Sequence, residues 1–69
     1  MKFKAGDRIR NGTMTATIVE AIPNKIFDRY VIQLNESLIN ELYPSNTIDE
    51  EYVLDKEYYR NEKLKDLLQ

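Results

Sequence analysis

Residues 27–34 read Phe-Asp-Arg-Tyr-Val-Ile-Gln-Leu and carry the clearest strand pattern in the chain. Alternate positions fall into two sets, Tyr30, Ile32 and Leu34 against Arg29, Val31 and Gln33. Successive side chains of a strand point to opposite faces of a sheet. We therefore expect Tyr30, Ile32 and Leu34 to face a core.

A second strand is predicted just before this one, over residues 14–22. The segment is rich in Thr, Val and Ile, which favour pleated surfaces. Its alternation breaks at Ile18 and Val19, and such a break indicates a β-bulge or a strong bend. The Pro-Asn-Lys sequence at residues 23–25 predicts the turn that joins the two strands.

Residues 3–10 predict the first strand. Phe3 and Ile9 share one parity, whereas Lys4, Arg8 and Arg10 share the other, which gives one face to the core and one to water. The Asn-Gly pair at residues 11–12 then predicts a tight hairpin turn.

The segments after residue 34 are less regular. The apolar residues of 35–46 fit either one helical turn or a ragged edge strand, and their spacing leaves both open. Residues 47–54 predict a last strand, with Ile48, Tyr52 and Leu54 pointing inward.

A helix is predicted over residues 56–69, which contain no Gly, Pro or β-branched residue. Asp55 can cap it through its carboxylate. Leu64, Leu67 and Leu68 lie at i, i+3 and i+4, but a helix of ~14 residues is marginal in isolation. The leucines therefore need an apolar surface, either on their own barrel or on another chain.

These segments predict a mainly β fold, a small barrel of about five short antiparallel strands with a C-terminal α-helix. The barrel occupies residues 1–55 and the helix residues 56–69, and the 69 residues form one domain.

One pattern runs through the predicted strands: Phe3-x-x-Gly6-Asp7-x-Ile9, a Thr-Ile-Val strand, Tyr30-x-Ile32 and an acidic stretch leading to Leu54. This layout resembles SH3-like barrels of the small bacterial and phage type, including KOW-like and Tudor-like domains. The resemblance implies an SH3-like barrel over about residues 3–55, and it implies no function. The sequence lacks the basic loop of ribosomal KOW proteins, an identifiable aromatic cage, and the tryptophan of eukaryotic SH3 domains.

The composition excludes most chemistry. With neither cysteine nor histidine, the chain has no disulfide, no thiolate or imidazole metal ligand and no histidine base. Neither serine, at 37 or 45, has a base beside it in sequence to activate it. The acidic run at residues 49–57 does not have EF-hand spacing and is interpreted as a solvated turn. We expect no catalytic, cofactor or metal site.

The N-terminal lysines Lys2 and Lys4 precede no apolar leader segment, and no apolar stretch approaches the ~20 residues that span a bilayer. These features predict a cytoplasmic protein with no membrane partner.

Protein binding is the leading functional hypothesis. Acidic residues steer basic partners and exposed tyrosines anchor interfaces, and the candidate residues are Tyr43, Asp49, Glu50, Glu51 and Tyr59. Small acidic chains without catalytic residues are typical of phages and mobile elements, where they bind and modulate host proteins. We therefore expect a non-enzymatic module with a protein partner, and a homodimer is left open.

Nucleic-acid binding is the alternative, with Lys4, Arg8, Arg10 and Arg29 as its candidate residues. Residues 1–34 carry a net charge of +3 and residues 35–69 a net charge of −5. The basic half could contact phosphates. The pI near 5.0 weakens this hypothesis, since the acidic half folds onto the same small body.

Overall fold

A computed structural model describes residues 1–35 and 37–68. Glu36 and Gln69, which fall within the predicted segments 35–46 and 56–69, lie outside the described residues, as does the side chain of Leu68. The described elements are, in order, β1 (Arg8–Asn11), β2 (Met14–Ile22), β3 (Arg29–Leu34), β4 (Asn40–Pro44), α1 (Ser45–Glu51), β5 (Val53–Leu54) and α2 (Lys56–Leu68). The predicted mainly β fold with a C-terminal helix is confirmed.

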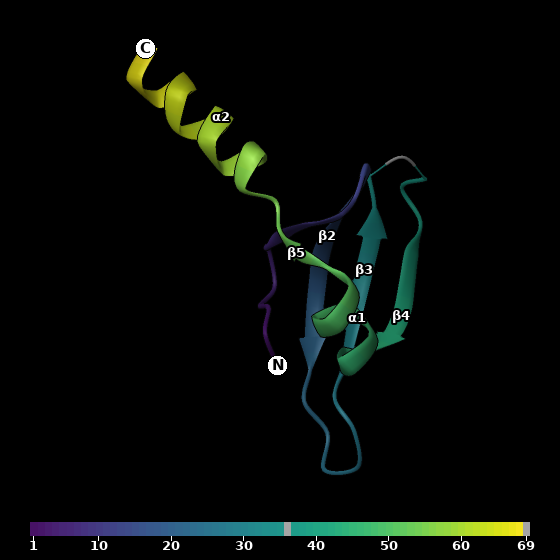
Figure 1. The fold of residues 1–69 in the computed structure, drawn as a ribbon. Coiled ribbons are helices and arrows are strands. Elements are labelled where there is room, and N and C mark those ends of the chain that lie inside the picture. Colours follow the sequence, from purple (N-terminus) through teal and green to yellow (C-terminus); the bar gives the residue numbers. More distant parts are fainter. Residues whose placement is uncertain (36, 69) are drawn as a thin grey trace.

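The strands of the described residues form one five-stranded sheet in the order β4-β3-β2-β1-β5, with antiparallel neighbours throughout (Figure 1). A tight turn joins β1 to β2 as predicted, but one residue later: Asn11 ends β1 opposite Met14, and the turn residues are Gly12, whose φ is +63°, and Thr13. Strands β4 and β5 form the two margins of the sheet.

Strand β2 has the predicted bounds, and its bulge is confirmed. The register with β3 shifts between Ile18 and Glu20, so Val19 has no partner across the pair. Strand β3 begins at Arg29, two residues later than predicted, after the loop that follows β2.

The first predicted strand is too long. Strand β1 begins only at Arg8, although Gly6 and Asp7 still exchange backbone hydrogen bonds with Ile18 of β2, and Phe3 is buried as expected. A turn separates Phe3 from β1: the Asp7 N–H donates to the Lys4 carbonyl and the Lys4 N–H donates to Asp7 Oδ2. Gly6 adopts a φ of +93°, a conformation that side chains disfavour and glycine allows.

Residues 40–44 form an edge strand, which settles the alternative left open for segment 35–46. The prediction of a strand over residues 47–54 is wrong except at its end. Helix α1 and the two-residue strand β5 replace it. Ile48 and Tyr52 are four residues apart, a helical spacing, and the Tyr52 N–H donates to the Ile48 carbonyl. Both are buried as predicted. Leu54 lies opposite the buried Ile9, on the predicted face, but at the margin of the sheet it is 43% exposed.

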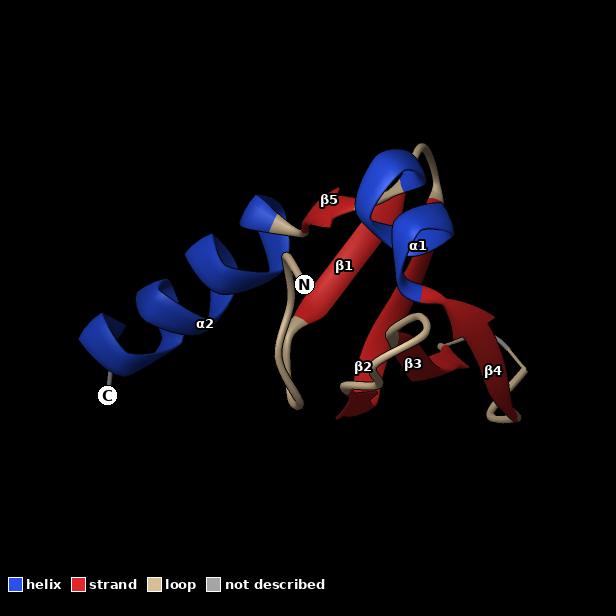
Figure 2. Ribbon diagram, turned by 90° about the horizontal axis from the view of Figure 1, so that it is seen from below, coloured by secondary structure: helices blue, strands red, loops and turns tan. Residues whose placement is uncertain are grey.

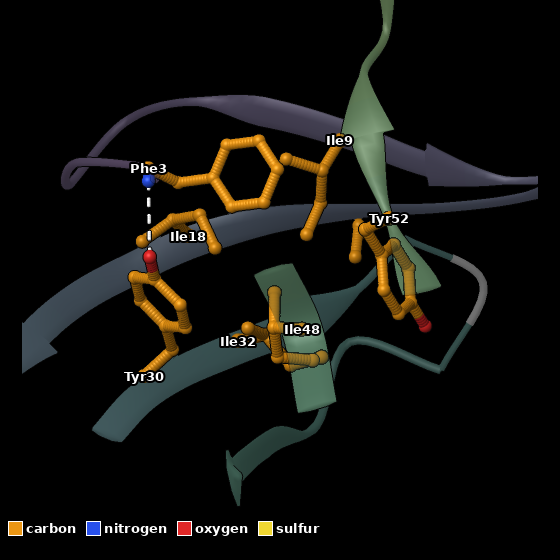
Figure 3. Close-up of a cluster of buried hydrophobic side chains, with 8 residues drawn as sticks. Phe3, Ile9, Ile18, Tyr30, Ile32, Ile48 and Tyr52 are labelled. Carbon is orange, nitrogen blue, oxygen red and sulfur yellow. Dashed lines mark hydrogen bonds between the residues drawn. The ribbon is translucent and has the colours of Figure 1, made fainter. Parts of the chain in front are cut away.

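The core lies between one face of the sheet and the segments that cross it (Figure 3). The buried sheet residues are Ile9, Ala16, Ile18, Tyr30 and Ile32, and the buried covering residues are Phe3, Ile48 and Tyr52. Leu34, predicted to share the face of Tyr30 and Ile32, is half-buried against this cluster.

The Tyr30 hydroxyl joins three segments that are distant in sequence. It accepts a hydrogen bond from the Phe3 N–H (2.9 Å) and donates one to Asp49 Oδ1 (2.7 Å). The Lys2 N–H donates to the same Asp49 oxygen at 3.2 Å. The N-terminal segment and α1 are thereby fixed to β3.

We predict that Tyr30→Phe lowers the free energy of unfolding by about 1–3 kcal/mol, because the buried Phe3 amide loses its acceptor. Urea denaturation measures the change. Tyr52→Phe is the matched control, since that buried hydroxyl contacts only the weak acceptor Met14 Sδ at 3.6 Å among the described residues. Equal losses in the two variants would contradict the assignment.

Candidate functional site

The β1–α2 junction, formed by Arg8, Arg10, Asp55, Glu57, Tyr58 and Tyr59, positions most of the predicted functional residues. Its centre is Asp55, which is only 5% exposed. The Asp55 N–H donates to the Arg8 carbonyl, and Oδ1 of Asp55 accepts the Tyr58 N–H at 3.2 Å. The predicted cap of the C-terminal helix is thus confirmed, and it ties the helix start to β1.

Both arginines of β1 make contacts within the junction. The Arg8 guanidinium lies 4.2 Å from the centroid of the Tyr58 ring, and the Arg8 N–H donates to the Tyr59 hydroxyl at 2.9 Å. Arg10 Nη1 donates to Glu57 Oε2 at 3.1 Å, and its Nε lies 3.8 Å from Asp55 Oδ1. Their positive charges are therefore matched by a ring face and two carboxylates.

The other two basic candidates lie elsewhere. Lys4 is exposed in the N-terminal segment, outside β1. Arg29 is on β3, opposite Ile22 of β2, and its guanidinium covers the Phe27 ring at 4.8 Å from the centroid. Strand β2 separates β1 from β3, so these four basic candidates do not lie side by side.

The acidic candidates are also divided. Asp49 is held by the Tyr30 hydroxyl and the Lys2 amide. Glu50 and Glu51 are exposed on α1. Because Asp55 and Glu57 belong to the β1–α2 junction, only part of the predicted acidic stretch is available to a partner.

Neither candidate tyrosine is fully exposed to a partner. Tyr43 is half-buried against the core, and its hydroxyl donates to Glu41 Oε2 at 2.6 Å. Tyr59 is 41% exposed, packs edge-on against Tyr58 with ring centroids 5.3 Å apart, and has its hydroxyl bound to β1.

Helix α2 leaves the sheet after its first turn and extends away from it (Figure 2). Leu64 and Leu67 are 50% and 74% exposed. The sheet of the same chain therefore does not cover these two leucines.

Exposed apolar side chains also gather around β4, and the sequence did not reveal them. Leu38 and Ile39 precede the strand, and Leu42 lies in its middle. The missed signal is parity: once the segment is recognised as a strand, Leu42 falls opposite Val31, on the face away from Tyr30.

Other site types receive little support within residues 1–35 and 37–68. No cluster of three or more acidic side chains there has the arrangement of a metal site. No helix described is long and apolar enough to cross a membrane. An open hollow is lined by Phe27, Asp28 and the start of α1.

The pKa values of three tyrosines are raised above their ordinary value of 10.0. Burial is the main cause for Tyr30 and Tyr52, with the Asp49 carboxylate adding to the rise at Tyr30. The hydrogen bond to Glu41 is the main cause for Tyr43. These hydroxyls are structural donors and stay protonated at neutral pH.

Comparison with protein-family models, curated proteins and solved structures finds no match to this chain. The SH3-like assignment therefore stays a prediction.

We predict that Asp55→Ala shortens α2 from its start and lowers the free energy of unfolding by about 1–2 kcal/mol, because the cap of the helix is lost. Circular dichroism at 222 nm and urea denaturation give the two readouts. Glu62→Ala, an exposed change on the same helix, should leave both nearly unchanged. Full helix content in Asp55→Ala would show that the cap is dispensable.

We also predict that stability falls as the pH rises above about 10. Because the folded-state pKa values are raised, the unfolded chain loses these protons first, and the stabilisation is complete only below the unfolded value. Urea denaturation from pH 7 to pH 11 measures the fall. In Tyr30→Phe the fall should be shallower, since one group with a raised pKa is gone. An unchanged slope of the unfolding free energy against pH would contradict this cause.

Proposed function

We propose that this chain is a non-enzymatic protein-binding module and that α2 is its main binding element. The observation that carries the proposal is the projection of α2 from the sheet with Leu64 and Leu67 exposed. The described contacts of α2 with the rest of the chain come from its first turn, through Glu57, Tyr58 and Tyr59. A short helix with so little support gains stability when a partner covers its apolar side.

The mode of recognition is a helix laid in an apolar groove, with leucines at i and i+3 as anchors. The β1–α2 junction holds the helix start in place and so sets its direction. Glu50 and Glu51, exposed on α1, are free to attract a basic surface of the partner.

The alternative of nucleic-acid binding loses support because Arg8 and Arg10 already contact Tyr58, Asp55 and Glu57. A phosphate would have to replace contacts that hold α2 to the sheet. Lys4 and Arg29 are the remaining basic candidates, and they lie on separate segments.

The test compares two double variants of α2. Leu64→Ser/Leu67→Ser removes the apolar side, whereas Glu62→Ser/Lys65→Ser removes an ion pair of 3.9 Å on the same turns and leaves the net charge unchanged. Both place two serines in the helix, so their intrinsic helix propensities fall by similar amounts.

We predict that proteins retained by the immobilised chain from a bacterial lysate are also retained by the control and lost by the leucine variant. For a purified partner, affinity should fall ~100-fold or more, because each leucine buried in an interface contributes about 1.5–3 kcal/mol. Calorimetry measures the affinity of each variant for the partner. Equal retention by both variants would contradict the role of α2. Tight binding of an oligonucleotide, weakened by Lys4→Ala and Arg29→Ala, would favour the nucleic-acid alternative.

A further inference from the structure

The open margin of β4 has a hydrogen-bonding pattern that can be derived from its pairing with β3. The Ser45 N–H donates to the Asp28 carbonyl at 2.9 Å, and Tyr43 lies opposite Tyr30. In an antiparallel pair, residues alternate between those whose backbone groups face the partner and those whose groups face away. Glu41 and Tyr43 therefore direct their backbone groups at β3, whereas Asn40, Leu42 and Pro44 direct theirs outward.

This margin has little of the usual protection of an edge strand. Natural edges are blunted by charged side chains, especially lysines, by prolines, by bulges or by very short strands, and β4 carries one charge, Glu41, and one proline. Strand β4 has five residues, a continuous register with β3 and no lysine or arginine. Pro44 stands at its end, at an outward position where the missing N–H costs no bond to β3. Strand β5, at the opposite margin, has only two residues.

We propose that β4 pairs antiparallel with β4 of a second copy of this chain, with Leu42 opposite Leu42 on the two-fold axis. In this register each Leu42 N–H meets the Leu42 carbonyl of the other copy, and each Asn40 N–H meets a Pro44 carbonyl. Every outward N–H of the strand thus finds an acceptor. Because Pro44 has no N–H, the carbonyl of Asn40 in the other copy is left without a donor at each end of the strand pair.

The side chains select this register over its neighbours. Glu41 lies opposite Tyr43 of the other copy, so the hydroxyl–carboxylate contact that each chain makes internally at 2.6 Å can form across the axis. Moving the axis to residue 41 would place two glutamates directly opposite each other, which destabilises a strand pair. Moving it to Tyr43 would leave the Asn40 N–H groups without a strand carbonyl.

The exposed side chain of Leu42 fits the same two-fold axis. Leu42, 53% exposed, meets its symmetry mate on the outer face of the joined sheet. A pair of five-residue strands buries little surface, so the dimer is weak and exchanges with the monomer. Association is then expected between micromolar and millimolar concentrations.

Sedimentation equilibrium over a concentration series tests the pairing. Leu42→Lys and Leu42→Glu each place like charges opposite each other and should weaken self-association ~10-fold or more. An equimolar mixture of the two variants should restore the dimer, because the introduced lysine faces the introduced glutamate only if residue 42 lies on the axis. Ile26→Lys, which introduces the same charge at an exposed residue of the loop between β2 and β3, is the control and should associate like the wild type.

Amide hydrogen exchange gives a second readout that needs no variant. In the monomer the Leu42 N–H faces solvent and exchanges fast, whereas the Tyr43 N–H is protected by β3. Raising the concentration should protect Leu42 and Asn40 together. A chain that stays monomeric to millimolar concentration, or a mixture that fails to re-associate, would overturn the proposal. So would a Leu42 amide protected only when a different protein is added, since the edge would then belong to that partner.

Discussion

The hydroxyl of Tyr30 is the one polar group on which the arrangement of this small core depends. It belongs to a buried residue of β3 and accepts a hydrogen bond from the Phe3 N–H (Figure 3), and it donates one to Asp49 on α1. Phe3 and Ile48 cover the sheet from segments 45 residues apart in the chain, and the bonds of this hydroxyl to the Phe3 amide and to Asp49 hold both segments. A buried polar group stabilises a fold when its bonds are satisfied, and here the bonds also set the path of two covering segments.

The strands near this tyrosine could be predicted because their side-chain parity matches their burial. The buried Tyr30 and Ile32 alternate with the less buried Arg29, Val31 and Gln33, and the break at Val19 marks the bulge. Helix α1 is not predicted because Ile48, Tyr52 and Leu54 also fit a period of two. The spacing of four from Ile48 to Tyr52 and the acidic residues between them favour a helix. The predicted strand at residues 3–10 is too long because side-chain parity does not reveal the turn that Gly6 and Asp7 make.

The candidate sites were harder to predict, because a charge in a sequence does not show what it contacts. Arg10 and Glu57 are 47 residues apart and Asp49 lies 19 residues from Tyr30, yet both pairs are in contact. Contacts over such separations removed Arg8, Arg10, Asp49 and Tyr59 from the residues freely offered to a partner. The leucines of α2 could be found because helical spacing is local, whereas Leu42 needed the register of β4 with β3.

The two proposed contact surfaces lie at opposite margins of the sheet, and this separation has a physical consequence. Helix α2 follows β5 at one margin, and β4 forms the other (Figures 1 and 2). A dimer joined through β4 would therefore leave both α2 helices uncovered. Two linked helices that reach two sites on one target bind with an effective concentration set by their spacing. Weak strand pairing and a weak helix contact would then reinforce each other, because each one lowers the entropy that the other must lose.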